Sequence, residues 1–363
     1  MPRARVAAVA LCGVTPMRVA SPARVAPRPR ARAPPRSTRR APASSPRAFA
    51  ESDDAGRDRA GDIALADVRR GEKIGAGSFG DVFAGTLRGD VAVVLKEGSA
   101  FRGGARFVEA EGRIWRRARG WSGGAKFLGV AGANAYLVFE DEGRDTLEGA
   151  LGDGGLGGVL GRGRDGAAFA EALGCATEAE ACKKVSRELL KCVKGLHDKK
   201  IIHRDVKPNN VLLTKKGLRL IDLGGAADLK TGQNYDEAET VFDPVYGPPE
   251  RYLTGKFGGG GGAGEWNKNK PDLFDAFSVG MVILQVSVPA FRKKNGMKGV
   301  RGELKTWAYD CEAWRASLPE RRQSDFSILD ENNGAGWKLV CGLVANRSQR
   351  ISVSKALSSP FCR

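Results

Sequence analysis

The stretch His203-Arg204-Asp205-Val206-Lys207-Pro208-Asn209-Asn210 decides the fold predicted for this chain of 363 residues. Its Asp, the Lys two residues later and the Asn three residues beyond that have the spacing of a catalytic loop for phosphoryl transfer. In that chemistry Asp205 accepts or orients the proton of an attacking hydroxyl, and Lys207 neutralises charge on the moving phosphoryl group. Asn210 holds a magnesium ion, and His203 is assigned a structural role.

A glycine-rich segment, Gly75-Ala76-Gly77-Ser78-Phe79-Gly80-Asp81-Val82, precedes this loop in the chain. The pattern G-x-G-x-x-G alone also occurs in dinucleotide-binding folds, where it closes a strand and opens a helix. Here residues 82–87 alternate like a second strand, and a third strand, 91–96, ends in Lys96. The glycines let backbone N–H groups approach phosphates. Phe79 is expected above the γ-phosphate and Val82 above the adenine.

Lys96 needs an acidic partner to hold it against the α- and β-phosphates. The next segment, 106–115, has helical spacing and contains Glu109 and Glu111, which cannot share a helix face because they are two residues apart. Apolar Ile114 and Trp115 lie one turn after Glu111. We therefore favour Glu111 as the partner, with two solvated carboxylates as the alternative.

Further acidic residues follow the catalytic loop at characteristic positions. Asp222, at the end of the strand-like segment 218–221, is the expected magnesium ligand. Glu250, in Tyr246-Gly247-Pro248-Pro249-Glu250, is expected to form a buried ion pair with Arg350. Asp275 begins a long apolar helix and is expected to anchor the backbone of the catalytic loop.

In this order the motifs resemble those of eukaryotic-type protein kinases, and Lys207 is the serine/threonine-type residue. The resemblance implies a two-lobed α+β fold over residues 68–363, with a β-rich small lobe at 68–142 and a helical large lobe at 143–363. It implies ATP and Mg²⁺ as cofactors and a protein substrate. The hinge at 139–142 would hold the adenine, so that Glu140, Glu142 and Leu212 complete the predicted nucleotide site.

Asp243 occupies the position, seven residues before Glu250, where such kinases usually carry Thr. Its carboxylate could form a charge-assisted bond with Lys207. It could instead repel Asp205 and raise the pKa of that residue. The distances that decide between these effects require a structure.

The formal charge of +17 is unevenly distributed. Residues 1–50 contain eleven Arg and no Lys, Asp or Glu, which leaves +6 for the rest of the chain. This segment is rich in Ala, Pro and Ser, so it resembles a disordered transit peptide, followed by a linker at 51–67. The alternative is a tail that reflects a GC-rich genome. Because the charge is concentrated there, nucleic-acid binding is not predicted.

The seven Cys and two His form no C-x-x-C pair and no zinc pattern. Cys182 and Cys192 lie in the helix predicted before the catalytic loop and are expected to pack in the protein core. The longest apolar run, 277–291, predicts a central buried helix and is too short to span a bilayer. The glycine-rich stretches 152–166 and 257–264 are expected to be mobile surface insertions.

Several segments of the large lobe resemble the chloroplast thylakoid kinases, namely the plant and algal state-transition kinase and its paralogue for photosystem II core proteins. They are 222–229 with Asn234-Tyr235, Asp243-Pro244-Val245-Tyr246-Gly247-Pro248-Pro249-Glu250, Pro271-Asp272-Leu273-Phe274-Asp275, Glu303-Leu304-Lys305, Tyr309-Asp310, Trp314-Arg315, 326–330 and Gly336-Trp337. This resemblance implies thylakoid photosystem II or light-harvesting proteins as substrates. It places the protein in the chloroplast, in the stroma or at the stromal face of the thylakoid.

The chain departs from that family at its N-terminal end. Family members are expected to carry a membrane span and, in the state-transition kinase, a lumenal Cys pair, whereas only Cys12 precedes the predicted domain here. Peripheral membrane association without a transmembrane helix is therefore expected. A catalytically weak pseudokinase scaffold is the alternative function.

Overall fold

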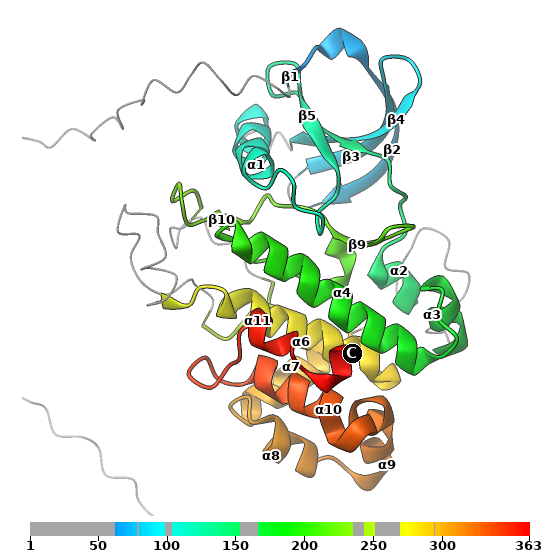
Figure 1. Ribbon diagram of the computed structural model, residues 1–363, viewed down its shortest axis with the longest axis vertical. Helices are drawn as coiled ribbons and strands as arrows, with labels where there is room; N and C mark the ends of the chain where they lie inside the picture. The colour runs from blue at the N-terminus through cyan, green and yellow to red at the C-terminus, as the bar shows by residue number, and fades with distance from the viewer. Residues whose placement is uncertain are drawn as a thin grey trace, which may run out of the picture. The chain divides into compact units, whose positions relative to one another are not determined.

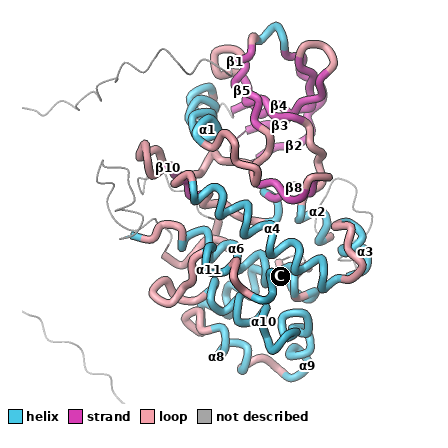
Figure 2. Tube along the Cα trace, viewed as in Figure 1, coloured by secondary structure: helices cyan, strands magenta, loops and turns pink. Residues whose placement is uncertain are grey.

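The computed structural model describes residues 62–77, 80–98, 104–152, 166–234, 243–250, 269–293 and 295–363. All of them lie within one compact unit, Ala55–Arg363. The predictions for Ser78, for Phe79, for residues 1–50 and for the glycine-rich stretches, 153–165 and 257–264, lie outside these residues. In the described part a β-sheet is followed by a helical region (Figures 1 and 2), which confirms the predicted two-lobed α+β fold.

The small lobe is a six-stranded sheet with the order β1-β5-β6-β4-β3-β2. Its strands are β1 Asp62–Ile63, β2 Val68–Gly77, β3 Gly80–Leu87, β4 Val91–Gly98, β5 Phe127–Ala131 and β6 Tyr136–Glu140. Strand β1 and the short 3₁₀ helix η1, Leu65–Asp67, fall inside the segment 51–67 that the sequence had assigned to a linker. Because β1 pairs in parallel with β5, the sheet includes residues that precede Val68.

The register of the antiparallel strands β2, β3 and β4 brings distant residues into one row. Val82 on β3 is opposite Gly75 on one side and opposite Lys96 on the other. Side chains directly opposite each other point to the same face of a sheet. Val82 and Lys96 therefore share one face, next to the glycine segment.

The large lobe is built mainly from helices, and helix α1 belongs to the small lobe (Figure 1). The helices are α1 Ala105–Arg117, α2 Leu147–Leu151, α3 Gly166–Ala172, α4 Glu178–Asp198, α6 Leu273–Ser287, α7 Gly296–Thr306, α8 Cys311–Ala316, α9 Glu320–Gln323, α10 Ser327–Val344 and α11 Val353–Ala356. Short 3₁₀ helices are η3 Pro208–Asn210, η5 Pro289–Phe291, η6 Ser324–Phe326 and η7 Pro360–Cys362. Helix α10 is interrupted at 331–334 by non-helical backbone.

Helices α4 and α6 form the centre of this lobe. Thr177 begins α4 with a capping box, in which its side chain accepts from Glu180 N and that of Glu180 accepts from Thr177 N. Every residue of α6 is buried, as predicted for the apolar run. The run continues to 291, but the α-helix ends at Ser287 because Pro289 disfavours helical backbone at the residue before it.

Two short antiparallel strand pairs carry the loops of the predicted site. Strand β7, Ile201–Ile202, pairs with β10, Ala227–Asp228, and β8, Val211–Thr214, pairs with β9, Gly217–Leu220. Cys182 and Cys192 on α4 are buried, as expected for core residues. No helix within the described residues combines the length and the apolar character needed to cross a bilayer.

Candidate active site

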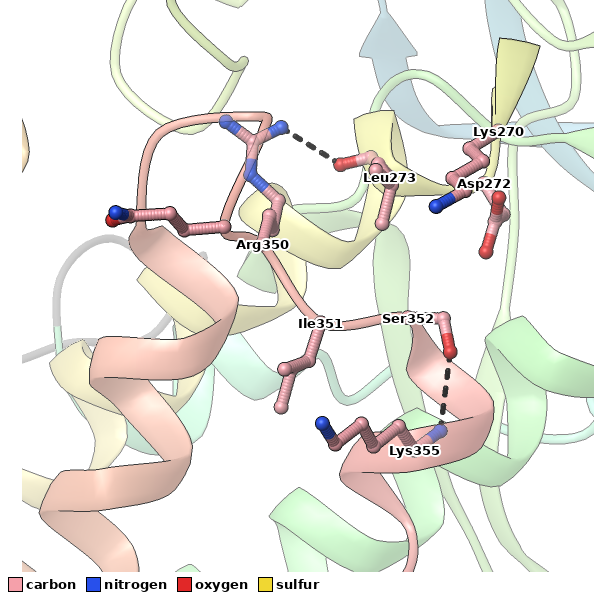
Figure 3. Close-up of a pocket in the computed structure, with 8 residues that line it drawn as sticks. Lys270, Asp272, Leu273, Arg350, Ile351, Ser352 and Lys355 are labelled. Carbon is pink, nitrogen blue, oxygen red and sulfur yellow. Dashed lines mark hydrogen bonds between the residues drawn. The ribbon is translucent and has the colours of Figure 1, made fainter. Parts of the chain in front are cut away.

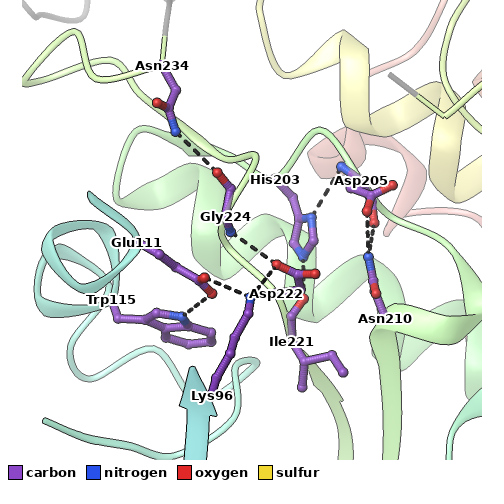
Figure 4. Close-up of polar contacts among 10 residues, drawn as sticks. All are labelled: Lys96, Glu111, Trp115, His203, Asp205, Asn210, Ile221, Asp222, Gly224 and Asn234. Atoms are coloured by element: carbon purple, nitrogen blue, oxygen red, sulfur yellow. Dashed lines mark hydrogen bonds and ion pairs between the residues drawn. The ribbon is translucent and has the colours of Figure 1, made fainter. Parts of the chain in front are cut away.

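Lys96 lies at the centre of a buried group of charged side chains that joins the two lobes (Figure 4). Its Nζ donates to Glu111 Oε2 at 2.7 Å and to Asp222 Oδ1 at 2.8 Å. Strand β4 supplies Lys96, helix α1 supplies Glu111, and the segment after β9 supplies Asp222. Trp115 Nε1, one turn along α1, donates to the other Glu111 oxygen at 3.2 Å. The structure thus pairs Lys96 with Glu111, whereas the side chain of Glu109 is 44% exposed.

Opposite charges keep Lys96 and Asp222 ionised. Burial lowers the pKa of Lys96, but the carboxylates of Asp222 and Glu111 outweigh it, so that the pKa is raised above its ordinary value. Burial likewise opposes ionisation of Asp222, and the Lys96 charge outweighs it, so that the pKa of Asp222 is lowered. A charged lysine can bind phosphate oxygens, and a charged carboxylate can bind magnesium.

The predicted catalytic-loop residues lie within hydrogen-bond distance of one another. The 3₁₀ helix η3 turns the chain so that Asn210 Nδ2 donates to the main-chain O of Asp205 at 2.8 Å and to its Oδ2 at 2.9 Å. Lys207 Nζ lies 3.0 Å from the other oxygen, Asp205 Oδ1. Both oxygens of this carboxylate, which is 5% exposed, are therefore held by neighbouring side chains.

Asp243 lies against Lys207. Its Oδ2 is 3.5 Å from Lys207 Nζ, and its Oδ1 accepts from the N–H groups of Val245 at 2.8 Å and Tyr246 at 3.0 Å. Burial is the largest cause that raises the pKa of Asp205, and the Lys207 charge opposes it. Of the two effects considered for Asp243, the distances favour the bond with Lys207.

Asp275 holds the start of the catalytic loop from helix α6. Its Oδ2 accepts from the N–H of His203 and its Oδ1 from that of Arg204, both at 2.8 Å. A third contact, His197 Nε2 to Asp275 Oδ2 at 2.8 Å, comes from α4. Burial favours the neutral acid, but His197 and His203 outweigh it and lower the pKa of Asp275. Sequence reasoning missed His197, because only the packing of α4 against α6 brings it to Asp275.

His203 itself links the catalytic loop to the metal-binding segment. Its Nε2 lies 3.1 Å from the main-chain O of Ile221, the residue before Asp222. Its Nδ1 accepts from the N–H of Asp205 at 3.3 Å. The ring therefore contacts both the catalytic loop and the residue before Asp222 (Figure 4).

Glu250 forms ion pairs with two arginines from the segment after α10. Arg350 Nη1 lies 2.6 Å and Arg347 Nη1 lies 2.9 Å from Glu250 Oε1. The sequence pointed to Arg350 but not to Arg347, although a spacing of three residues could have suggested it. Burial raises the pKa of Glu250, but the bonds from both arginines outweigh it and lower the pKa.

The glycine segment joins β2 to β3, and the structure describes Gly75-Ala76-Gly77 and Gly80. A Cβ on Gly80 would lie 1.9 Å from the main-chain O of Glu97, so the fold itself requires glycine there. A Cβ on Gly75 would make only an ordinary contact, 3.7 Å to Val82 Cβ. The packing therefore does not require glycine at 75.

The predicted hinge residues make internal contacts through their side chains. Glu140 forms an ion pair with Lys126, and Glu142 Oε2 accepts from the N–H of Lys126 at 3.0 Å. The main-chain N–H groups of Glu140 and Asp141 donate to the main-chain O atoms of Lys126 and Ala92, at 3.0 and 3.3 Å. Leu212 lies on β8, opposite Arg219 in the hairpin that leads to Asp222.

Two oxygen atoms fit a magnesium ion. Asn210 uses Nδ2 to bind Asp205, and Asp222 uses Oδ1 to bind Lys96 and the N–H of Gly224. Asn210 Oδ1 and Asp222 Oδ2 take no part in these bonds and are the hard donors that magnesium prefers. Among the described residues no group of three or more His, Cys, Asp or Glu is suited to a metal.

A separate cavity of about 400 Å³ lies in the large lobe, at the start of α6 and the segment leading into α11 (Figure 3). Asp272, Ser352 and Lys355 are among the residues that line it. Of the predicted site residues only Arg350 does so. The cavity therefore belongs to the region around the Glu250 ion pair and not to the Lys96 group.

Comparisons with known proteins agree with this geometry. The model of the protein kinase domain family matches residues 162–362. The chloroplastic serine/threonine-protein kinase STN8 of Arabidopsis thaliana is 39% identical over 193 residues, which cover 49% of this chain and 39% of that protein. STN7, also chloroplastic and from Arabidopsis thaliana, is 31% identical over 323 residues, 80% of this chain and 56% of that protein.

The chain thus spans about two fifths of the length of STN8 and somewhat more than half of the length of STN7. A crystal structure of a Stt7 homologue from Micromonas algae, soaked with ATP, superposes with a TM-score of 0.72. Its sequence identity to this chain is 31%, and the match covers 92% of this chain and 98% of that one.

Proposed function

This chain belongs to the protein kinase family, and from that membership we propose that it transfers the γ-phosphate of ATP to Ser or Thr of protein substrates. The observation that carries the proposal is the pairing of Lys96 with Glu111 and Asp222, 2.7 and 2.8 Å away. These contacts bring together three segments far apart in sequence. A fold used only for binding would not need them beside an intact Asp205–Asn210 pair.

Each residue of the group has a distinct role in this proposal. ATP supplies the phosphoryl group, and magnesium neutralises phosphate charge when both are bound. Lys96, held by Glu111, binds phosphate oxygens, while Asp222 and Asn210 offer oxygens to magnesium. Asp205 orients the substrate hydroxyl and takes its proton, and Lys207 stabilises charge on the transferred group.

The glycine segment gives independent support for nucleotide binding. Packing does not explain why residue 75 is glycine, since a Cβ there would lie 3.7 Å from Val82 Cβ, an ordinary contact. A phosphate group that approaches the backbone closely would supply the missing reason. The row formed by Gly75, Val82 and Lys96 would then run from the phosphates to the adenine.

The relatives named as chloroplastic kinases support a chloroplast location, and the resemblance of the large-lobe segments to the thylakoid kinases supplies the substrate class. We assign to this chain thylakoid proteins of photosystem II or its antenna, phosphorylated on their stromal faces. Purified protein with Mg-ATP should label washed thylakoid membranes on Thr or Ser, and an Asp205→Asn variant should not. Failure of the wild-type protein to transfer phosphate would favour the pseudokinase scaffold. Labelling only of Tyr or of soluble proteins would contradict the substrate class.

The Arg-rich segment 1–50 supports chloroplast targeting in this proposal. A fusion of residues 1–60 to a fluorescent protein should enter chloroplasts and be shortened there. A variant in which the eleven Arg are replaced by Gln is the matched control and should stay outside. Retention of the unaltered fusion in the cytosol would refute the targeting.

Peripheral attachment at the stromal face of the thylakoid completes the proposal. Washing membranes with high salt or alkali should release the protein, since such contacts are electrostatic and screened. Release only by detergent would contradict this attachment.

A further inference from the structure

Helix α1, which carries Glu111, is tied to the large lobe by a salt bridge at its C-terminal end. Arg117, the last residue of α1, donates from Nε to Asp228 Oδ2 at 3.0 Å. Its Nη2 donates to the main-chain O of Lys199 at 3.1 Å. The Asp228 side chain is only 1% exposed, against 34% for Arg117. A carboxylate buried to this degree depends strongly on a cationic partner.

Asp228 is itself fixed within the segment that follows Asp222. It lies in β10, which pairs with β7, and β7 leads directly into His203. Its second oxygen, Oδ1, accepts from the N–H of Lys230 at 2.9 Å. The position of Asp228 is therefore fixed relative to both the segment that follows Asp222 and the catalytic loop.

A second contact joins the same segment to α1 beside Glu111. Gln233 Nε2 donates to the main-chain O of Ala110 at 2.6 Å. The segment after Asp222 thus touches α1 at two points, next to Glu111 and at the helix end.

The other contacts of α1 are mainly apolar and face the small-lobe sheet. Val108, Ile114 and Trp115 are buried there. Burial of apolar surface is non-directional, so it determines which face of α1 packs but only weakly determines how far the helix slides. Directional polar contacts are what can place Glu111 within 2.7 Å of Lys96.

We propose that Arg117 is a positioning residue whose salt bridge to Asp228 holds α1 where Glu111 reaches Lys96. The kinetic part of this inference rests on the proposed kinase activity. Without the bridge, α1 would drift outward and Lys96 would lose one of its two anchors. The position of α1 would then depend less on the segment that carries Asp222, because the Gln233 contact to Ala110 would be left without the bridge at the helix end.

Steady-state kinetics with Mg-ATP on phosphatase-treated full-length protein test the proposal. Arg117→Met should lower kcat/KM for ATP by roughly tenfold, the size expected for a coupling contact outside the reacting atoms. Arg116→Met is the matched control, because the ion pair that the neighbouring Arg116 forms among the described residues is with Asp62 of the small lobe, at 2.7 Å. That variant should keep wild-type kinetics, and Arg117→Lys should recover most of the loss.

A double-mutant cycle with Glu111→Gln separates positioning from general damage. If Arg117 acts through Glu111, Arg117→Met should cause no further loss in the Glu111→Gln protein. The pair Arg117→Met with Asp228→Asn removes both charges, so it should fold and show the same kinetic loss. Additive losses in the cycle would overturn the inference.

The possible failures are distinguishable. A wild-type protein without phosphotransfer would defeat the proposed function. Active wild-type and Arg116→Met proteins, with Arg117→Met equal to both, would defeat the positioning role alone.

Discussion

The carboxylate of Asp205 is held in place by two neighbouring side chains. Asn210 holds one of its oxygens at 2.9 Å and Lys207 the other at 3.0 Å. The first contact orients the carboxylate and the second stabilises its charged form. Asp222 follows Ile221, whose main-chain O contacts the His203 ring, and its carboxylate is instead bound to Lys96. Two aspartates with different partners are expected to have different duties.

Substitution of each aspartate should separate those duties. Asp205→Asn should leave nucleotide affinity nearly unchanged and lower kcat by roughly 10²–10⁴, the usual effect of a positioned acid–base group. Asp222→Asn should instead weaken magnesium-dependent nucleotide binding, because one metal oxygen is lost. Equilibrium binding of Mg-ATP and single-turnover rates measure both. An Asp205→Asn protein with near wild-type turnover would contradict the assignment.

The pH dependence of activity should report the environment of Asp205. Its ionised form is the active one, and burial raises its pKa, so kcat/KM should fall with decreasing pH at values above the ordinary Asp pKa of about 4. Lys207→Met removes the charge that opposes the rise, so this acid limb should move to higher pH. Lys207→Arg keeps the charge and serves as control. An acid limb that stays in place or moves to lower pH in Lys207→Met would argue against this account.

At the scale of elements, helix α6 holds the large lobe together by close packing. It is buried along its whole length, and Gly280 allows α10 to approach it. A Cβ at Gly280 would lie 2.7 Å from Leu343 Cβ and 2.8 Å from Val344 Cγ2. The distance between these two helices therefore depends on one missing methyl group.

Alanine at two helical glycines should have opposite effects on stability. Gly280→Ala should destabilise the protein by about 1–3 kcal/mol, because it overpacks the α6–α10 contact. Gly299→Ala on α7 meets open space and should stabilise by about 0.5–1 kcal/mol, since alanine favours helix. Denaturant unfolding measures both free energies. Equal effects at the two positions would contradict the packing described.

The stability that the ion pairs of Glu250 contribute should decrease in acid. Replacing it with Gln leaves Arg350 buried without a carboxylate and should cost about 3–5 kcal/mol at neutral pH. Burial raises the pKa of Glu250, but its arginine partners outweigh burial and lower it, so its stabilisation is complete above the ordinary Glu pKa of about 4.3 and is lost as pH falls through the lowered pKa. The difference in unfolding free energy between wild type and Glu250→Gln should therefore shrink below about pH 4. A pH-independent difference would exclude this linkage.

At the scale of the whole molecule, the small lobe depends on residues just before the predicted domain. Strand β1 pairs with β5, and Asp62 forms an ion pair with Arg116 of α1 at 2.7 Å. Asp67 forms another with Arg88 at 3.3 Å. These contacts add a strand at the edge of the sheet and tie α1 to that strand.

Two truncated proteins should differ because of these contacts. A protein that starts at Asp62 should fold and keep its activity, whereas one that starts at Val68 should melt at a lower temperature. The lost strand pairing and the two ion pairs are the physical reason. Thermal unfolding monitored by circular dichroism, together with Mg-ATP turnover, measures the difference. Identical melting temperatures would show that residues 62–67 contribute nothing to the lobe.

Local spacing in the sequence predicted the catalytic loop, the glycine segment and the strand that leads to Asp222. Asp205, Lys207 and Asn210 lie in one short loop, and η3, Pro208–Asn210, brings the Asn210 side chain back to Asp205. The apolar run likewise predicted α6, and Pro289 explains why that helix ends earlier than the run. Such features depend on neighbours along the chain, so the chain itself encodes them.

Contacts between distant segments were decided only by the tertiary structure. The packing of α4 on α6 brought His197 to Asp275, a contact that no spacing in the sequence predicted. The same holds for Arg117 and Asp228, which are 111 residues apart. Side chains such as these meet because whole elements pack in one arrangement, and no short-range pattern specifies that arrangement.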